Sequence, residues 1–253
     1  MITNSFDPYS KPFLRAEDLY ETATANDIVT FVTFKQKVVD TVVEQYGGKL
    51  ECSYNTTNGK QNIYSFFVDD KKYFIYMTGI GATVASIIMK EVAVVTGSRK
   101  FVYFGSCGVL NEEECRGKII VPTEAYRDEG VSYHYMEACD FVQVRNAWKV
   151  QEILKSFDIP FAAGKVWTTD AIYMETVNKV NKHKEEGCIA VEMEVSGIEA
   201  VSRYYNIDNY HILFSADSLG NEEDWYRADL GGDVELNLQL KAFKVALNIA
   251  SKL

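Results

Sequence analysis

The sequence predicts an α/β fold in which a largely parallel sheet lies between layers of helices. Short β-branched and aromatic runs alternate along the chain with longer segments of helical periodicity. The predicted strands are apolar on both faces, which is typical of a sheet that is covered on both sides. In such sheets ligands bind at the carboxyl ends of the strands, so the chemistry is expected there.

The elements follow from the spacing of apolar residues. The predicted strands cover residues 27–34, 61–68, 73–78, 101–104, 119–121, 163–167, 189–193 and 211–215. The predicted helices cover residues 35–46, 82–95, 147–157, 195–205 and 234–253. The last helix follows Asp233, a plausible cap, and places one apolar stripe on Leu236, Leu240, Phe243, Leu247 and Ala250.

The length and composition predict one compact unit. A chain of 253 residues with 47% hydrophobic residues can bury a large core. It has no internal repeat or low-complexity tract, and none of its four prolines marks a linker. We therefore expect residues 1–253 to form a single domain.

The composition also excludes several classes of partner. A net charge of -10 and a pI of about 4.9 would repel a nucleic-acid backbone. No run approaches the roughly 18 apolar residues of a membrane span, and the N-terminus lacks the pattern of a secretory signal. The five cysteines contain no Cys-x-x-Cys and indicate neither a disulfide framework nor a zinc site. We expect a cytoplasmic protein without a nucleic-acid partner, a membrane partner or a metal.

Two predicted strands end in glycine-bearing turns. Residues 73–78 run into Gly79-Ile80-Gly81-Ala82 and then a helix, where backbone N–H groups can approach an anion. Residues 101–104 run into Gly105-Ser106-Cys107-Gly108, which adds a hydroxyl. Two such turns could share one anion. The alternative also stays open, in which both are ordinary tight turns and the thiol is a small buried hydrophobe.

Carboxylates stand at two further strand ends. Glu192 and Glu194 flank Met193 where a strand passes into a helix, and period-two geometry would put both on one side. An ionised carboxylate can accept hydrogen bonds from the vicinal hydroxyls of a ribose. Asp217 follows the strand at 211–215 and, if buried, could protonate a departing base. The alternatives are that Glu192 and Glu194 are solvated charges at a strand edge and that Asp217 is an ordinary turn residue.

Six motifs in this order resemble the nucleoside phosphorylase family, which includes hexameric purine nucleoside phosphorylases, uridine phosphorylases and methylthioadenosine nucleosidases. The resemblance covers about residues 73–219. The motifs are Thr78-Gly-Ile-Gly-Ala82, Gly105-Ser-Cys-Gly108, Val121-Pro-Thr-Glu-Ala-Tyr-Arg-Asp-Glu-Gly130, Trp167-Thr-Thr-Asp-Ala-Ile-Tyr173, Val191-Glu-Met-Glu194 and Ser215-Ala-Asp217.

The resemblance implies a three-layer α/β/α fold around a central mixed, partly barrel-like β-sheet. It also implies homo-oligomers, dimers or hexamers built from dimers, in which a neighbour completes each pocket. Its reaction would use inorganic phosphate as co-substrate and no cofactor. Because the uridine branch matches less well at Asp217, a purine is favoured over uracil.

The resemblance further implies a role for each site residue. Phosphate would be bound by Gly79, Gly81, Ser106 and Lys37; the nucleoside would be bound by Ile172, Tyr173, Glu192, Met193, Glu194, Ser106, Cys107 and Gly108. Ile172 and Tyr173 would form a wall against the flat base. Asp217 would act on the base as the catalytic acid, and Arg227 would help it to give up its proton.

Two departures from the family pattern concern phosphate. Many phosphorylases carry Gly-Asp-Pro-x-Arg where this chain has Thr33-Phe-Lys-Gln-Lys37, and an arginine where it has Tyr103. A lysine point charge does not replace an arginine fork well. Lys35 or Lys37, Arg127 and a basic side chain of a neighbouring subunit remain open as substitutes.

The working hypothesis is phosphorolysis of a ribonucleoside to ribose 1-phosphate and free base. Three alternatives stay open. The first is a nucleosidase that uses water, which the missing arginines favour; the glutamate usual in that branch is replaced here by lysines. The second is a pyrimidine nucleoside phosphorylase. The third is a nucleoside-binding or storage protein without turnover, since a fold does not guarantee chemistry.

Overall fold

Five strands close into a barrel at the centre of the molecule. The computed structural model describes the chain except for residues 58, 220–225 and 228–232. The strands pair in a ring in the order β5, β10, β6, β8, β9 and back to β5. They are β5 (Ser98–Val109), β6 (Ile119–Asp128), β8 (Phe161–Thr169), β9 (Cys188–Glu192) and β10 (Asp208–Ser218). The ring contains three parallel pairs, β5–β10, β6–β8 and β8–β9, and two antiparallel pairs, β10–β6 and β9–β5, which confirms the mixed, partly barrel-like sheet.

The sheet continues beyond the barrel on one side of β5. There β1 (Asn26–Thr33) and β4 (Lys71–Met77) run parallel to β5, and β3 (Gly59–Val68) and β2 (Lys49–Thr56) complete the edge as antiparallel strands. Two short strands, β7 (Phe141–Gln143) and β11 (Tyr226–Arg227), pair with β6 and β10. The sheet is therefore mixed, and the expectation of a largely parallel sheet was too simple.

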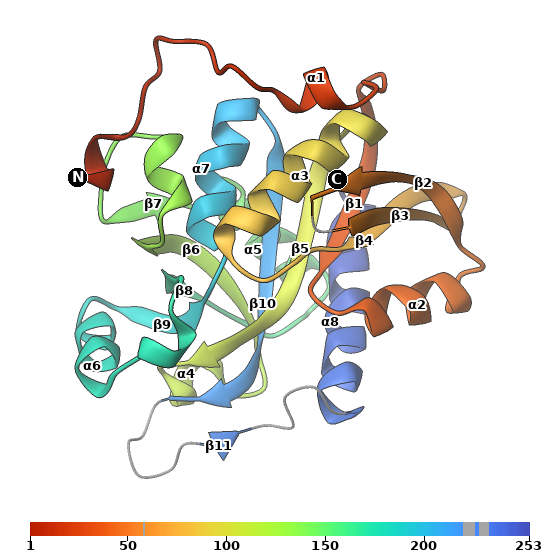
Figure 1. The fold of residues 1–253 in the computed structure, drawn as a ribbon. Helices are drawn as coiled ribbons and strands as arrows, with labels where there is room; N and C mark the ends of the chain where they lie inside the picture. Colours follow the sequence, from red (N-terminus) through yellow and green to blue (C-terminus); the bar gives the residue numbers. More distant parts are fainter. Residues whose placement is uncertain (58, 220–225, 228–232) are drawn as a thin grey trace.

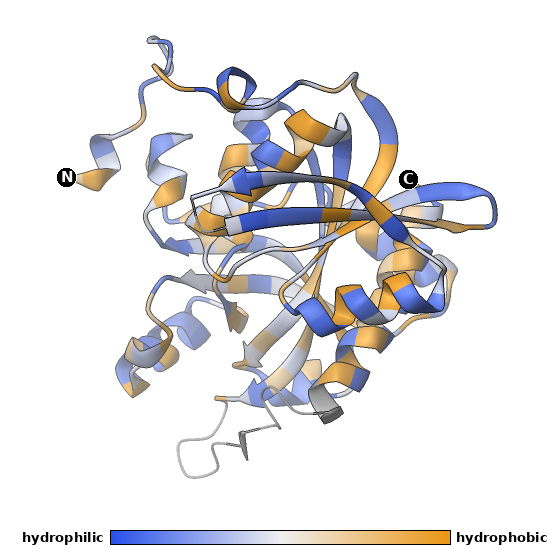
Figure 2. Ribbon diagram, turned by 45° about the vertical axis from the view of Figure 1, so that its right-hand side comes forward, coloured by the Kyte–Doolittle hydropathy of each residue, from blue (hydrophilic) through white to orange (hydrophobic). Residues whose placement is uncertain are grey.

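Helices cover both faces of this sheet. On one face α3 (Ala82–Thr96) and α7 (Val195–Tyr205) lie side by side (Figure 1). The other face packs against α2 (Gln36–Gln45), α5 (Ala147–Ser156) and α8 (Asp233–Ser251). Each layer has its own apolar core, and the helices carry hydrophobic residues interspersed with hydrophilic ones (Figure 2). The three-layer α/β/α fold is thus confirmed.

The remaining helices are short or peripheral. They are α1 (Ala16–Leu19), α4 (Glu112–Cys115), α6 (Val177–Glu185) and three 3₁₀ turns, η1 (Ile2–Asn4), η2 (Val131–His134) and η3 (Ile172–Met174). None of the helices in the described ranges combines the length and the apolar character that a membrane crossing needs.

One difference from the predicted elements bears on the site. The segment Gly105-Ser-Cys-Gly108 is not a turn, because β5 continues through it to Val109. It stays extended because β10 pairs alongside it, with Phe214 opposite Ser106 and Asp217 opposite Gly108. Closing the barrel therefore lengthens both strands beyond their apolar runs and brings their polar ends together.

One close approach fixes the starts of α3 and α7. A Cβ on Gly197 would lie 2.6 Å from the Cβ of Ala82, so only a glycine lets the two helices come this near. Ala82 is the first residue of α3, and Gly197 is the third of α7. The contact thereby brings the residue before each helix, Gly81 and Glu194, to the same place.

Candidate functional site

A cavity of about 400 Å³ opens at the ends of β1, β5, β9 and β10. Its volume falls within the roughly 300–1,000 Å³ usual for small-molecule sites. The residues that line it are Thr33, Phe34, Lys35, Ile80, Phe104, Gly105, Ser106, Cys107, Gly108, Ile172, Glu175, Val191, Glu192, Met193, Glu194, Ala216, Asp217 and Gln239. Three of the six motifs thus meet in one cavity through several residues each, as the sequence predicted.

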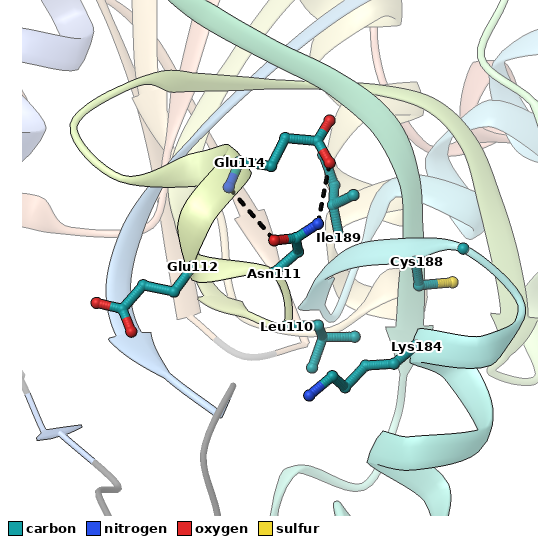
Figure 3. A pocket seen from close by; sticks show the side chains of 8 residues that line it. Leu110, Asn111, Glu112, Glu114, Lys184, Cys188 and Ile189 are labelled. Carbon is teal, nitrogen blue, oxygen red and sulfur yellow. Dashed lines mark hydrogen bonds between the residues drawn. The ribbon is translucent and has the colours of Figure 1, made fainter.

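A second hollow, of about 430 Å³, lies beside α4 and the end of α6 (Figure 3). Its polar groups hold the local structure together. Asn111 accepts a hydrogen bond from the backbone N–H of Glu114 and donates one to that residue's carboxylate. None of the predicted site residues lines this hollow, so the chemistry points to the first cavity.

The positive end of α3 faces Glu194. Gly81 precedes the helix with a φ of +99°, a conformation that favours glycine, and its N–H donates to the Glu194 carboxylate at 2.7 Å. The carboxylate thus takes the amide that the sequence assigns to phosphate. Burial, followed by the charge of Glu192, raises the pKa of Glu194 well above the usual range of a carboxyl group.

Glu192 has a different set of partners. Its carboxylate accepts the backbone N–H groups of Glu194 at 2.7 Å and Val195 at 2.8 Å, and the hydroxyl of Thr168 donates to it as well. These bonds tie the end of β9 to the first turn of α7. Burial raises the pKa of Glu192 despite these donors. Glu192 therefore orients the backbone of Glu194 while it lines the cavity.

A bulge aims Asp217 across the cavity. The β5–β10 register shifts between Ser215 and Asp217, so the aspartate faces Gly108. One carboxylate oxygen of Asp217 lies 3.3 Å from the position that a Cβ on Gly108 would take. Ser106 stands two residues earlier on β5, and strand geometry separates the two positions by about 6–7 Å. The hydroxyl and the late carboxyl thus mark two ends of one site.

The thiol of Cys107 is buried between these ends. It donates to the carbonyl of Phe214 at 3.5 Å, and burial raises its pKa well above that of an ordinary thiol. A thiol that resists ionisation is a poor nucleophile. Cys107 therefore contributes packing to the wall of the cavity.

Glu175 is the cavity carboxyl that the sequence analysis missed. It follows η3 and lines the same cavity as Asp217. Burial and the charge of Asp217 raise the pKa of Glu175 to about 7, and Lys179 opposes them. No motif surrounds Glu175, and a lone glutamate in a loop-like stretch is ordinarily a solvated charge, so no sequence signal could single it out.

Several predicted residues lie outside the lining of the cavity. Tyr173 is 97% exposed, Lys37 is exposed on α2, and Gly79 does not line the cavity, whereas Lys35 does. Arg127 is 2% exposed, does not line the cavity, and donates a hydrogen bond to the hydroxyl of Ser132 at 2.8 Å, so its contacts are structural. The backbone of Arg227 pairs with Asp217, but its side chain lies outside the described part of the chain.

Comparisons with known proteins agree with this architecture. The family model described as the phosphorylase superfamily matches residues 30–246. A purine nucleoside phosphorylase DeoD-type from Alkaliphilus metalliredigens is 26% identical over 181 residues, which are 70% of this chain and 77% of that protein.

Two solved structures show the same fold. The 5'-methylthioadenosine/S-adenosyl homocysteine nucleosidase of Campylobacter jejuni has a TM-score of 0.73 at 16% identity over 90% of this chain and 100% of that one. A uridine phosphorylase from Vibrio fischeri has a TM-score of 0.72 at 21% identity over 90% and 93%.

Proposed function

The chain belongs to the phosphorylase superfamily, and we propose that it cleaves the N-glycosidic bond of a purine ribonucleoside with inorganic phosphate. The products are free base and ribose 1-phosphate. The observation that carries this proposal is the meeting of Ser106, Met193, Glu194 and Asp217 around one cavity. These are the groups that an anion, a sugar and a base each require.

The proposed reaction proceeds by displacement at the anomeric carbon. A phosphate oxygen near Ser106 and Lys35 forms a bond to that carbon as the bond to the base breaks. The electron pair of the broken bond moves into the base, and Asp217 gives its proton to N7. Glu194 accepts hydrogen bonds from the ribose hydroxyls and supports the positive charge on the sugar. Positioning and electrostatics suffice, so the reaction requires no organic cofactor and no metal.

Purine is proposed over pyrimidine for two reasons. Asp217 can protonate N7, an acceptor that uracil lacks, and the relative from Alkaliphilus metalliredigens is a purine nucleoside phosphorylase. We place the activity in nucleoside salvage in the cytoplasm. The exposed apolar side chains of Ile80 and Ile172 line the cavity and suit the surface of a homo-oligomer, covered by a second copy of the chain.

A nucleosidase is the second candidate, and the balance of charge favours it. Among the described residues that line the cavity, Lys35 is the single lysine or arginine beside four carboxyl groups. Glu194 also holds the Gly81 amide. Both features weaken the case for a tightly bound phosphate.

The test is to incubate the protein with adenosine, inosine and uridine, with and without phosphate, and to measure free base and ribose 1-phosphate. Phosphate-dependent release of purine with ribose 1-phosphate is the expected result. Equal release without phosphate would assign the nucleosidase activity. Cleavage of uridine alone would assign the pyrimidine branch, and binding without any turnover would indicate a storage protein.

The role of Asp217 has its own test. A general acid contributes roughly 100- to 10,000-fold to the rate. Asp217→Ala should therefore lose far more purine turnover than nucleoside affinity. Wild-type turnover in this variant would remove Asp217 from the mechanism and leave the reaction class intact.

A further inference from the structure

Two carboxyl groups from separate elements line the same cavity. Asp217 reaches it from the end of β10, and Glu175 reaches it from the segment between η3 and α6. They come from distant parts of the chain and lie close enough for the charge of Asp217 to act on Glu175. The proposed reaction uses one of these groups and leaves Glu175 without a role.

The electrostatic surroundings favour a proton on this end of the cavity, because burial and the charge of Asp217 raise the pKa of Glu175 to about 7. In the described part of the chain, the charged groups that act on Glu175 are Asp217 from β10 and Lys179 from α6. Lys179 also pairs with Asp128 at 3.4 Å, so its charge is divided. Two ionised carboxylates in one partly buried site repel each other, and retaining one proton relieves this.

A carboxyl group and a carboxylate in one cavity offer one donor and one acceptor. Adenine presents the complementary pair on one edge, since N7 accepts and the exocyclic amino group donates. A 6-oxopurine presents two acceptors on that edge, N7 and O6. One of its acceptors would then face the lone pairs of a carboxylate.

Building on the proposed function, we propose that Glu175 makes this site selective for 6-aminopurine nucleosides over 6-oxopurine nucleosides. The protonated carboxyl group of Asp217 donates to N7, and the Glu175 carboxylate accepts from the exocyclic amino group. When the proton lies on Asp217, one cause of the raised pKa of Glu175 is removed, so the ligand and the pair favour the same arrangement. Glu175 acts here as a specificity residue and not as the acid.

The experiment compares kcat/KM for adenosine, inosine and purine riboside in the wild type and in Glu175→Gln. The wild type should prefer adenosine to inosine by about tenfold or more, because a site built for one hydrogen-bonding group rejects its opposite. In Glu175→Gln the amide can donate to O6, so the ratio of adenosine to inosine should fall at least about tenfold. Purine riboside has N7 but no exocyclic group, and its kcat/KM should change less than about threefold.

Glu185→Gln is the matched control, because Glu185 is an exposed glutamate at the end of α6. It should leave all three values of kcat/KM unchanged.

The pH dependence of the wild type tests the inference without any variant. Lowering the pH from 8 to 6 adds the proton that the pair shares, so the wild-type kcat/KM for adenosine should rise at least about threefold.

The possible failures are distinguishable. If no purine nucleoside is cleaved with or without phosphate, the proposed function is wrong and the inference falls with it. If both purine nucleosides are cleaved but the ratio is the same in Glu175→Gln as in the wild type, the inference alone is overturned. A wild-type preference for inosine at pH 8 would overturn it as well.

Discussion

Two glutamates, Glu199 within helix α7 and Glu194 at its N-cap, have opposite surroundings. Glu199, in the middle of the helix, is fully buried, and its Oε2 lies 3.9 Å from Nε of Arg145 and 3.6 Å from Nε of Arg203. Glu194, at the start of the helix, accepts the Gly81 amide, and no ion pair of its carboxylate is found among the described residues. Burial raises both pKa values.

The difference separates a structural carboxylate from one that is available to a ligand. The carboxylate of Glu199 pairs with two arginines, and Glu199 does not line the cavity. His211 lies 3.8 Å from Glu199, but burial lowers its pKa to about 3, so it is neutral and adds no charge. Glu194 has neighbouring carboxyl groups in place of cations, and it faces the cavity. Placing a carboxyl group near other carboxyl groups without a cation costs free energy, and such a cost is typical of functional sites, where a bound ligand can offset it.

The largest expected effect is the loss of activity in Glu194→Gln. The amide still accepts from Gly81, but it is neutral and offers fewer acceptors to the ribose. With charged hydrogen bonds worth about 1.5–3 kcal/mol each, kcat/KM should fall roughly 100-fold or more. Glu199→Gln should stay within about threefold of the wild type when both are assayed well below their melting temperatures. A similar loss in both variants would mean that the contrast between the two glutamates is wrong.

The next effect is on stability, where Glu199→Gln should lose more than Glu194→Gln. Glu199→Gln leaves Arg145 and Arg203 without their shared counter-charge. Breaking a buried pair costs about 3–5 kcal/mol, and because both arginines reach water we expect about 2–3 kcal/mol. Urea unfolding at pH 7 measures this value. Glu194→Gln should not be destabilised there, and a loss of about 2 kcal/mol or more in that variant would assign Glu194 a structural role.

A smaller effect appears in the pH dependence of Glu194→Gln. The folded-state pKa of Glu194 is raised above its unfolded value. The wild type therefore keeps the full contribution of this group below the unfolded pKa and loses it as the pH rises through the folded pKa. The amide does not titrate. Relative to the wild type, the variant should gain about 1–2 kcal/mol between pH 5 and pH 8 in urea unfolding; a constant difference would show that the carboxyl group is not perturbed.

The smallest effect is expected for Arg203→Ala. Arg145 continues to neutralise Glu199 in this variant, so only part of the pairing energy is lost. The side chain of Arg203 is about one-third exposed, and we expect a loss of about 0.5–1 kcal/mol. Urea unfolding beside Glu199→Gln makes the comparison. A larger loss than in Glu199→Gln would indicate that Arg203 acts through its bond to the carbonyl of Gln143.

The accuracy of the sequence-based elements followed the strength of local periodicity. The helix predicted at 195–205 is α7 without a change of boundary, and β1, α2, α3 and α5 lie within one residue or so of their predicted ends. The edge strand β2 was missed because its residues are largely polar and its ladder with β3 supplies the stability. The helix α6 was missed because its exposed face dominates its composition.

The site residues that stand in a sequence motif were predictable, and those whose role depends on packing between distant segments were not. Glu194 and Asp217 stand in recognisable motifs, and both line the cavity. Lys35 and Lys37 could not be ranked, because their spacing alone does not tell which one turns toward the cavity at the start of α2. Glu175 had no signal, since its significance depends on a partner 42 positions away in the sequence.

The sequence by itself determined the alternation of strands and helices, the glycines at the start of α3, and the residues proposed to bind an anion, a sugar and a base. These properties are local, because periodicity, backbone freedom and functional groups belong to short segments. Only the tertiary structure decided that β5 and β10 extend and close a barrel, that Glu194 takes the Gly81 amide, and that Glu175 and Asp217 line one cavity. Those outcomes depend on burial and on the distances between charges, which exist only once distant segments pack together.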